Sequence, residues 1–432
     1  MIPRYTREEM GRVWSDANRF QRWLEVEMAA TATLEEAGVV PRGTAEAFRA
    51  RAKVDIARIE ELEARVKHDV VAFTMAVGES VGDPHARWLH YGLTSNDVVD
   101  TAQALLVREA SKLIAQGLEK LGEALQKRAY EFKDTPQIGR THGMHAEPIT
   151  FGLKMALWYA ENRRNIERFR AAAAQMAVGK ISGAVGNCGD LGPETEERIC
   201  KKLGLEVAAV SSQVIQRDRH AQYVSTLAIV AASLEKIALE IRHLQRSEVR
   251  EAEEPFASEQ RGSSIMPHKR NPVNCEQVCG LARVVRAHAQ AALENVALWH
   301  ERDISHSSVE RVILPDSTIL VDYLLARMTG IVEKMRVFPE RMRRNLEATH
   351  GVIFSGPLLR DLVEAGATRE DAYKLVQKNA MHVWRNSTDF KSALLKDKDV
   401  TKALSKKDIE ECFDLQYHLR NVDKTFEELG IK

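Results

Sequence analysis

The chain has 432 residues, too many for one ordinary hydrophobic core, so we expect two or three domains. Its 62 Lys and Arg residues equal its 62 Asp and Glu residues, and a formal net charge of zero excludes a nucleic-acid or anionic-membrane binder that depends on bulk positive charge. A hydrophobic content of 44% and a charged content of 29% are typical of a soluble globular protein.

The N-terminal segment MIPRYTREEM lacks the apolar stretch of a signal peptide, and no apolar run is long enough to span a bilayer. The five cysteines, at positions 188, 200, 275, 279 and 412, do not show the paired CxxC spacing of a structural zinc site. We therefore expect a cytoplasmic protein that acts with no membrane and no nucleic acid as partner.

Long helical periodicity dominates the middle of the chain. Residues 219–250 contain neither Pro nor Gly, and their apolar residues recur at steps of three and four. A helix of this length would extend roughly 45–50 Å. The same pattern recurs over 98–132, 149–176, 272–300 and 316–337. The sequence therefore predicts an all-α fold with a central bundle of long helices, and convincing alternating β patterns are almost absent.

We divide the chain into three helical domains: an N-terminal domain 1–98, the central long-helix bundle 99–340, and a small C-terminal domain 341–432. Shorter helices with explicit start signals mark the last domain. Thr368 and Ser405 each precede an Asp by three residues, as in a capping box with Asp in the role of Glu.

Polar residues that can carry chemistry gather in the few breaks between the long helices, at 82–97, 134–148, 179–193, 255–272 and 300–315. A bundle whose active groups lie at helix ends is typically built in this way. The glycine-rich break 179–193 matches neither GxxxxGK[ST] nor GxGxxG, so its glycines are interpreted as a turn between helices.

One break contains the sequence RGSSIMPHKRNP, residues 261–272, which we call the lid loop. Gly262 permits unusual backbone angles, Asn271 could cap the next helix and Pro272 suits its first turn. A flexible loop and a helix start would explain these three residues. This interpretation does not explain why Lys269 follows two serines, so a plain loop and a catalytic lid both stay open on the loop alone.

The lid loop closely resembles the signature of the fumarase/aspartase superfamily, Gly-Ser-Ser-x-Met-Pro-x-Lys-x-Asn. Within that superfamily the chain resembles the adenylosuccinate lyase family, through PRY (3–5), KHDVVAF (67–73), HYGLTSNDVVDTA (90–102), GRTHGMHAEPITFG (139–152) and ERDISHSSVERV (301–312). The resemblance implies a tetrameric core of long helices, with each site assembled from three subunits of a homotetramer. It also implies fumarate release from a succinylated nucleotide, with no metal and no organic cofactor.

Breaking a succinyl C–N bond needs a base for a weakly acidic C–H, stabilisation of the aci-carboxylate that forms, and an acid for the leaving nitrogen. The resemblance implies that Ser263 is the base, and positive charge must lower its pKa, with Lys269 and backbone N–H groups as the expected suppliers. It implies that His142 is the acid, which suits the pKa of histidine. His68 is expected to assist binding or proton transfer, and Asp69 either orients His68 or is an ordinary solvated carboxylate.

The remaining candidates bind substrate by resemblance. Lys269 is expected to hold the succinyl carboxylates together with Asn271, Thr94 and Ser95. The nucleotide end has no phosphate loop, so separate side chains must bind its anion. These are Arg4, Tyr5, Arg302, Ser307 and Arg311, although both late arginines also fit ordinary surface charges. Further candidates for substrate contact are Lys67, Asp69, His90, Thr141, Gln213, Ser264 and Glu276.

Several alternatives stay open at this point. The spacing His142, His145, Glu147 also fits metal ligands, although no third nitrogen or thiolate ligand has supporting spacing, and His145 is better interpreted as structural. Glu276 would also suit a helix dipole, and His90 could be a plain hydrogen-bonding residue. At the level of function, another fumarate-releasing lyase such as argininosuccinate lyase and a non-catalytic helical scaffold are the alternatives.

Overall fold

The computed structural model describes residues 1–257 and 259–432. Helices account for most of these residues, which confirms the predicted all-α class. In the described part of the chain the strands are short and form three two-stranded sheets. The contacts divide the chain into two compact units. Unit 1 comprises 1–119, 164–235 and 277–327, and unit 2 comprises 120–163, 236–276 and 328–432. The predicted division into three domains stays a prediction.

The N-terminal part of unit 1 is a group of short helices around one helix of six turns. Its elements are η1 (Pro3–Tyr5), α1 (Glu8–Val13), α2 (Asp16–Glu36), α3 (Thr44–Arg51), α4 (Ile56–Val66), α5 (Asp69–Val81) and η2 (Ala86–Trp88). Ser15 begins α2 by accepting a hydrogen bond from the N–H of Asn18. The rings of Phe20, Trp23 and Phe73 pack with centroids 5.2 to 6.0 Å apart and form the core of this group.

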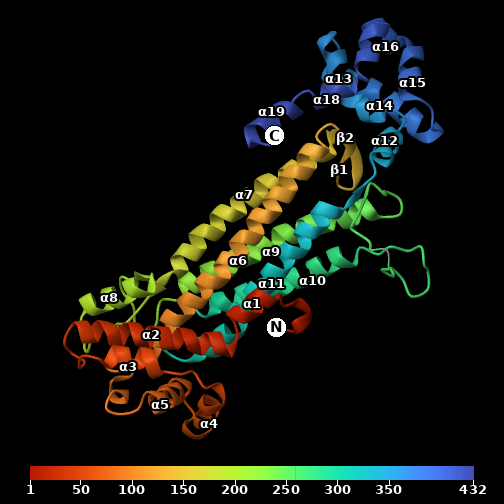
Figure 1. Ribbon diagram of the computed structural model, residues 1–432. Coiled ribbons are helices and arrows are strands. Elements are labelled where there is room, and N and C mark those ends of the chain that lie inside the picture. Colours follow the sequence, from red (N-terminus) through yellow and green to blue (C-terminus); the bar gives the residue numbers. More distant parts are fainter. Residues whose placement is uncertain (258) are drawn as a thin grey trace. The chain divides into compact units, whose positions relative to one another are not determined.

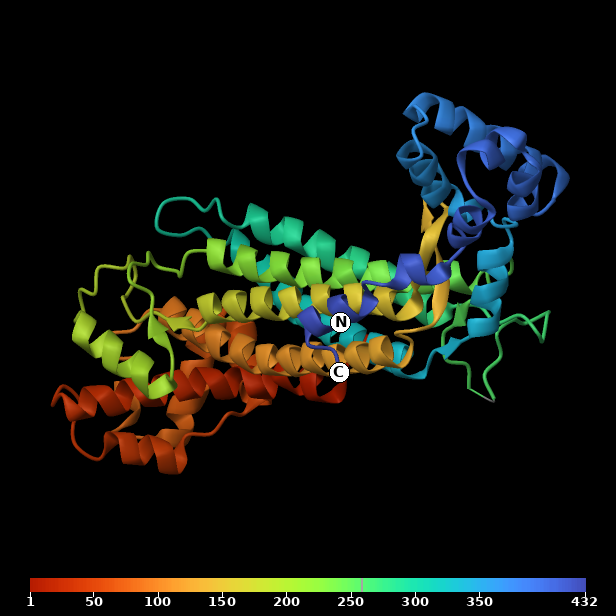
Figure 2. The same cartoon turned by 90° about the horizontal axis from the view of Figure 1, so that it is seen from above.

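The five predicted long helices are present: α6 (Ser95–Glu131), α7 (Phe151–Met176), α9 (Asp218–Gln245), α10 (Val273–Glu294) and α11 (Ser305–Lys334), of which α11 begins well before its predicted range. Their segments in unit 1 lie side by side (Figures 1 and 2). The hydroxyls of Ser111 and Tyr223 bond across α6 and α9 at 2.8 Å. At Gly117 of α6, a Cβ would lie 3.1 Å from a methyl carbon of Leu325 in α11, so the glycine permits close helix packing.

The prediction that residues 300–315 form a break is wrong in its second half. Helix α11 begins at Ser305 and continues through Pro315. Proline inside a helix removes one backbone hydrogen bond and normally disfavours the helix. Here Ile313, Leu314 and Ile319 are buried on both sides of the proline, and this packing outweighs the local cost.

The break 134–148 contains a β-hairpin that the sequence did not reveal. Strands β1 (Pro136–Thr141) and β2 (Met144–Thr150) are antiparallel, with a register shift between Ile138 and Arg140. They belong to unit 2, where α12 (Pro339–Glu347) packs against β1. Regular alternation of polar and apolar residues is missing because the bulge changes which face the side chains occupy.

The remaining elements are short. Unit 1 also contains α8 (Pro193–Leu203) and the parallel pair β3 (Val178–Gly179) and β4 (Glu206–Val207). Unit 2 contains the antiparallel pair β5 (Ala252–Glu253) and β6 (Arg336–Val337). It ends with η3 (Val352–Phe354), α13 (Ser355–Glu364), α14 (Arg369–Asn386), α15 (Phe390–Lys396), α16 (Lys398–Ala403), α17 (Lys406–Glu411), α18 (Leu415–Leu419) and α19 (Val422–Leu429).

The predicted start signals of the C-terminal helices are correct in one case and half correct in the other. Ser405 and Asp408 form a reciprocal capping box at α17. At α14, Thr368 accepts the N–H of Asp371, but the Asp371 carboxylate accepts from the Thr368 hydroxyl at 2.7 Å and not from the backbone. No helix in the described part of the chain combines the length and apolar character that crossing a membrane requires.

Candidate active site

The predicted site residues divide between the two units. Unit 2 holds the lid loop and the hairpin, with Thr141, His142, Ser263, Ser264, Lys269, Asn271 and Glu276. Unit 1 holds the others, namely Arg4, Tyr5, Lys67, His68, Asp69, His90, Thr94, Ser95, Gln213, Arg302, Ser307 and Arg311. Each set is described below within its own unit.

The lid loop closes on itself at its base. The Asn271 side-chain amide donates to the carbonyl of Gly262 at 2.8 Å, which joins the two ends of the loop. A Cβ at position 262 would lie 2.0 Å from the carbonyl oxygen of Lys269, so a residue larger than glycine would push these backbones apart. The amide of Gln245, the last residue of α9, donates to the carbonyl of Arg270 at 3.0 Å and supports this closed base, which we call the neck of the lid.

Ser263 stands inside this loop with donors directed at its hydroxyl. Its Oγ accepts from the N–H groups of Ile265 at 3.3 Å and Met266 at 3.1 Å. Backbone N–H dipoles that converge on an oxygen favour its anionic form. Ser264, the next residue, is exposed. Among the described residues, the local geometry therefore distinguishes the two hydroxyls, because the backbone donors that a basic serine needs are directed at Ser263.

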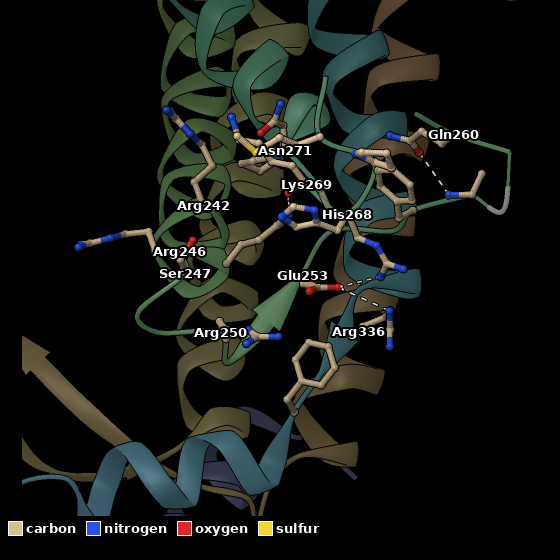
Figure 3. A pocket seen from close by; sticks show the side chains of 18 residues that line it. Arg242, Arg246, Ser247, Arg250, Glu253, Gln260, His268, Lys269, Asn271 and Arg336 are labelled. Atoms are coloured by element: carbon tan, nitrogen blue, oxygen red, sulfur yellow. Dashed lines mark hydrogen bonds and ion pairs between the residues drawn. The ribbon is translucent and has the colours of Figure 1, made fainter. Parts of the chain in front are cut away.

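A basic cavity of about 1140 Å³ lies beside the lid loop in unit 2 (Figure 3). Lys269 and Asn271 line it from the lid, and Arg242, Arg246 and Arg250 line it from the end of α9 and the turn that follows. The carboxylate of Glu253 lies 3.4 Å from Arg270 and 3.6 Å from Arg336. With one acid among several cations, the lining of this cavity favours anionic ligands.

The predicted helix cap at Asn271 is wrong, because its side chain is used at the neck of the lid. The start of α10 is capped by Glu254 instead. One carboxylate oxygen accepts from the N–H and side chain of Asn274 at 3.0 and 2.8 Å, and the other accepts from the N–H of Cys275 at 2.9 Å. Glu254 is buried and precedes the lid by seven residues, so spacing rules could not find it. Glu276 lies exposed in the first turn of α10.

The hairpin presents His142 on a strained turn. His142 has φ +54°, Gly143 has φ +81°, and both residues are exposed between β1 and β2, with Thr141 ending β1. Positive φ is uncommon outside glycine, although histidine adopts it more readily than most residues, and it is often found at functional sites. The exposed turn leaves the imidazole of His142 accessible to a ligand or to another chain.

The base of the hairpin is fixed by Glu251, which the sequence analysis missed. Its buried carboxylate accepts from Arg140 at 2.6 and 3.0 Å, from Gln137 at 2.7 Å and from Asn345 at 2.7 Å. Burial alone would raise the pKa of Glu251, but the hydrogen bonds and the Arg140 charge lower it overall. Burial and the same arginine lower the pKa of His145.

In unit 1, the pair Asp69 and Arg311 connects α5 to α11. Arg311 donates to the Asp69 carboxylate in a charge-assisted hydrogen bond. Burial alone would raise the pKa of Asp69, and the arginine lowers it overall. His68 instead caps α5, with Nδ1 accepting from the N–H of Val71 at 3.4 Å. The 3.6 Å between His68 and Asp69 is long for a hydrogen bond, so Asp69 primarily holds Arg311. Lys67, with φ +57°, precedes them.

His90 is held by a buried carboxylate. The imidazole Nδ1 of His90 lies 2.6 Å from Glu27, and the backbone N–H of His90 donates to the same carboxylate at 2.9 Å. Burial alone would lower the pKa of His90, but the hydrogen bond and charge of Glu27 raise it overall. Thr94, four residues on, donates its N–H to Asp97 at 2.8 Å, and Ser95 begins α6. The sequence named His90 but not Glu27, which lies 63 residues away.

The nucleotide-end candidates of unit 1 make separate contacts. Arg302 donates through Nη1 to the side-chain oxygen of Gln213 at 2.9 Å, and Gln213 donates to the carbonyl of Ala184 at 2.9 Å. Ser307 and Arg311 line a cavity of about 260 Å³. Tyr5 packs edge-on against Tyr323 with ring centroids 5.4 Å apart, and Arg4 is exposed in η1.

Across residues 1–257 and 259–432, no group of three or more His, Cys, Asp and Glu side chains lies together in a way that could hold a metal ion. The alternative interpretation of His142, His145 and Glu147 as metal ligands therefore has no geometric support in the described chain.

Comparisons with known proteins agree with this architecture. Residues 4–287 match a family model described as lyase, and residues 351–429 match one described as adenylosuccinate lyase C-terminus. Adenylosuccinate lyase from Bacillus subtilis is 52% identical over 431 residues and that from Staphylococcus saprophyticus 49% over 432, with full coverage of both chains in each case. The chain belongs to the adenylosuccinate lyase family. The structure of a fumarate lyase from Mesorhizobium sp. BNC1 matches all of both chains with a TM-score of 0.91 at 26% identity.

Proposed function

We propose that the chain eliminates fumarate from adenylosuccinate to give AMP, and from succinylaminoimidazole carboxamide ribotide to give the corresponding aminoimidazole carboxamide ribotide. Full-length identity of about one half to proteins named adenylosuccinate lyase supports this C–N lyase activity over that of argininosuccinate lyase. The match of residues 351–429 to the C-terminal model of the same family supports it further. The observation that carries the proposal is the lid loop, in which Ser263 accepts two N–H groups beside a basic cavity.

In this mechanism Ser263 removes a proton from the succinyl carbon next to the carbon that carries nitrogen. The electron pair of that C–H bond is held in the adjacent carboxylate as an aci-carboxylate until the C–N bond breaks. His142 protonates the leaving nitrogen, with His68 assisting, so that fumarate and the aminated nucleotide are released. Lys269, Asn271, Thr94 and Ser95 bind the two carboxylates and stabilise the additional negative charge, for which Lys269 supplies a full positive charge.

At the nucleotide end we assign the phosphate to Arg4, Tyr5, Arg302, Ser307 and Arg311. Arg302 supports this assignment because it is half-buried and burial lowers its pKa, so an anion beside it would stabilise the cation. Gln213, Lys67, Asp69, His90, Thr141, Ser264 and Glu276 complete the proposed substrate contacts.

We further propose a homotetramer in which each site takes residues from three subunits. Exposed apolar side chains on the long helices support an association of this kind, among them Leu157, Ile229, Leu239, Val284 and Val312. A cytoplasmic location is proposed because Cys188, Cys200 and Cys412 are free thiols, as is usual in a reducing compartment.

The test is fumarate release by the purified protein, with adenylosuccinate, succinylaminoimidazole carboxamide ribotide and argininosuccinate supplied in separate reactions. Fumarate from the two nucleotides and none from argininosuccinate is the expected result. A correctly folded protein that releases fumarate from neither nucleotide would refute the proposed activity. Sedimentation of the same preparation measures the number of subunits.

A further inference from the structure

A buried ionic cluster lies beneath the nucleotide-end residues of unit 1. Arg217, at the start of α9, is fully buried and donates to both oxygens of Asp100 at 2.7 and 2.9 Å. It also donates to both oxygens of Glu310 at 2.8 and 3.0 Å and to the carbonyl of Ile215 at 2.6 Å. Two carboxylates on one guanidinium leave a net negative charge in the interior, which favours a further donor beside them.

His306 connects this cluster to Arg302. The imidazole is buried, with 2% of its surface exposed, and its two nitrogens face opposite partners. Nδ1 lies 3.2 Å from Glu310 and 3.2 Å from Nη2 of Arg217. Nε2 lies 3.5 Å from Nε of Arg302, which is the long end of the hydrogen-bond range.

Counting hydrogens assigns the tautomer of His306. Nη2 of Arg217 carries two hydrogens, and Asp100 and Glu310 accept both of them. Nδ1 of His306 is therefore left to donate to Glu310. Nε of Arg302 can only donate, so Nε2 of His306 must be the acceptor. The imidazole is thus neutral, with its proton on Nδ1, and offers a lone pair to Arg302.

These contacts hold Arg302 on two sides. Among the described residues, Nε of Arg302 donates to His306 and Nη1 donates to Gln213. These two neutral partners fix the orientation of the guanidinium, and with it the direction of the other N–H groups. An arginine side chain has several rotatable bonds, and restricting them before a ligand arrives lowers the entropy lost on binding. Both partners accept hydrogen bonds without neutralising the positive charge that an anion would meet.

We infer that His306 is a positioning residue that orients the guanidinium of Arg302 toward the phosphate of the substrate. This inference rests on the proposed function, in which Arg302 contacts the nucleotide phosphate. His306 itself touches no reacting atom, so it should act on binding and leave the chemical step unchanged. A histidine that only fills space between α9 and α11 would affect stability alone.

Two amide variants separate the positioning role from a purely structural role, because their side chains carry the same amide group on chains of different length. In His306→Gln the side-chain amide reaches the position of Nε2 and can still accept from Arg302. In His306→Asn it reaches only the position of Nδ1 and keeps the contact with Glu310. The measurements are kcat and KM for adenylosuccinate, and the Kd of AMP from calorimetry, which does not depend on turnover.

We expect His306→Asn to raise KM and the Kd of AMP by about five- to tenfold, an effect in the range of one ordinary intramolecular hydrogen bond, with kcat within about twofold of the wild type. His306→Gln should keep all three values within about twofold of the wild type. The matched control is His220→Gln. It replaces the other buried imidazole near Arg217, and that imidazole contacts Gln103 rather than Arg302. It should leave KM unchanged.

Equal effects of Asn and Gln, or no change in KM with either, would overturn the inference, as would a loss of kcat at constant KM. If His306→Asn does not fold, His306→Leu, which removes both nitrogens, should show the same rise in KM relative to Gln. Turnover by the wild-type protein is measured in the same series. Its absence would count against the proposed function, whereas normal turnover with KM unaffected at position 306 would count against this inference alone.

Discussion

The ionic cluster of unit 1 and the lid loop of unit 2 both contain basic side chains, but the two regions use the positive charge differently. Arg217 is enclosed and pairs with two buried carboxylates, so its positive charge is fully neutralised inside the protein. Lys269 is exposed at the edge of a cavity whose charged lining residues are mostly cationic. In the ionic cluster the charges form ion pairs that hold helices together, whereas in the lid loop the positive charge of Lys269 stays available to a ligand. The comparison teaches that a cation is a better candidate for binding when its neighbours do not already neutralise it.

The sharpest test of the lid side is Ser263→Ala, with Ser264→Ala as the matched control. Removing the proposed base should lower kcat by about 10²–10⁴-fold, because the hydroxyl that accepts from Ile265 and Met266 is lost. Ser264→Ala should reduce kcat by less than about tenfold, and neither variant should move the thermal midpoint far, since both residues lie on an exposed loop. Fumarate release gives kcat. Equal losses at the two serines would contradict the distinction.

The largest effect on stability is expected from Arg217→Met in the ionic cluster. The change leaves Asp100 and Glu310 buried without their cation, which should lower the free energy of unfolding by about 3–5 kcal/mol. Thermal unfolding measures the change. Arg58→Met, which breaks ion pairs to Glu61 and Glu79 at the surface, is the control and should shift the midpoint far less. Similar shifts for the two variants would mean that burial does not decide the value of these pairs.

His220 should make the same region sensitive to acid. Burial, followed by the charge of Arg217, lowers the pKa of His220 to about 4 from an ordinary 6.5. Between these values the unfolded state binds a proton that the folded state does not. Stability from this residue is therefore complete above pH 6.5 and lost as pH falls toward 4, by up to about 3 kcal/mol.

The variant His220→Gln isolates this contribution, because other groups also titrate in acid. The difference in unfolding free energy between wild type and variant should change between pH 6.5 and 4 and stay constant above pH 7. A difference that is independent of pH would show that His220 titrates equally in both states.

The smallest of these effects concerns the junction between the lid and α10. Glu254→Gln removes the charge that caps the first turn of α10 and should cost about 1–2 kcal/mol of stability. The neighbouring Glu253→Gln is the matched control and should cost less, since within the described residues Glu253 pairs with Arg270 and Arg336 at longer distances. Chemical denaturation of both variants provides the comparison, and a larger loss at Glu253 would contradict the capping role.

Most of the helical fold could be predicted, because long helices repeat one apolar pattern over many turns. Residues 219–250 show this, and the observed α9 covers most of that range. The hairpin and the continuous α11 were missed because their reasons are not local. A bulge hides the alternation in the hairpin, and buried residues on both sides of Pro315 maintain a helix that a local rule would end.

In the candidate site, too, local patterns could be predicted and non-local contacts could not. Ser263, Lys269 and Asn271 could be proposed because they lie within one short contiguous pattern that resembles a known signature. The buried carboxylates elsewhere in the site could not be proposed, since Glu251, at the base of the hairpin, meets Gln137 across 114 positions, and Glu310, in the ionic cluster of unit 1, meets Arg217 across 93. A single sequence gives no measure of which distant side chains become neighbours, and these partners appear only after folding.

The neck formed by Asn271 and Gly262 has a consequence for engineering. Because the loop is tied at its base, and Glu254 independently starts the following helix, the intervening segment is an exchangeable cassette. Substitutions within residues 263–270, between the two neck residues, should therefore alter the rate of the elimination without disturbing the helices on either side. A designer could therefore vary the reacting loop while leaving the scaffold untouched.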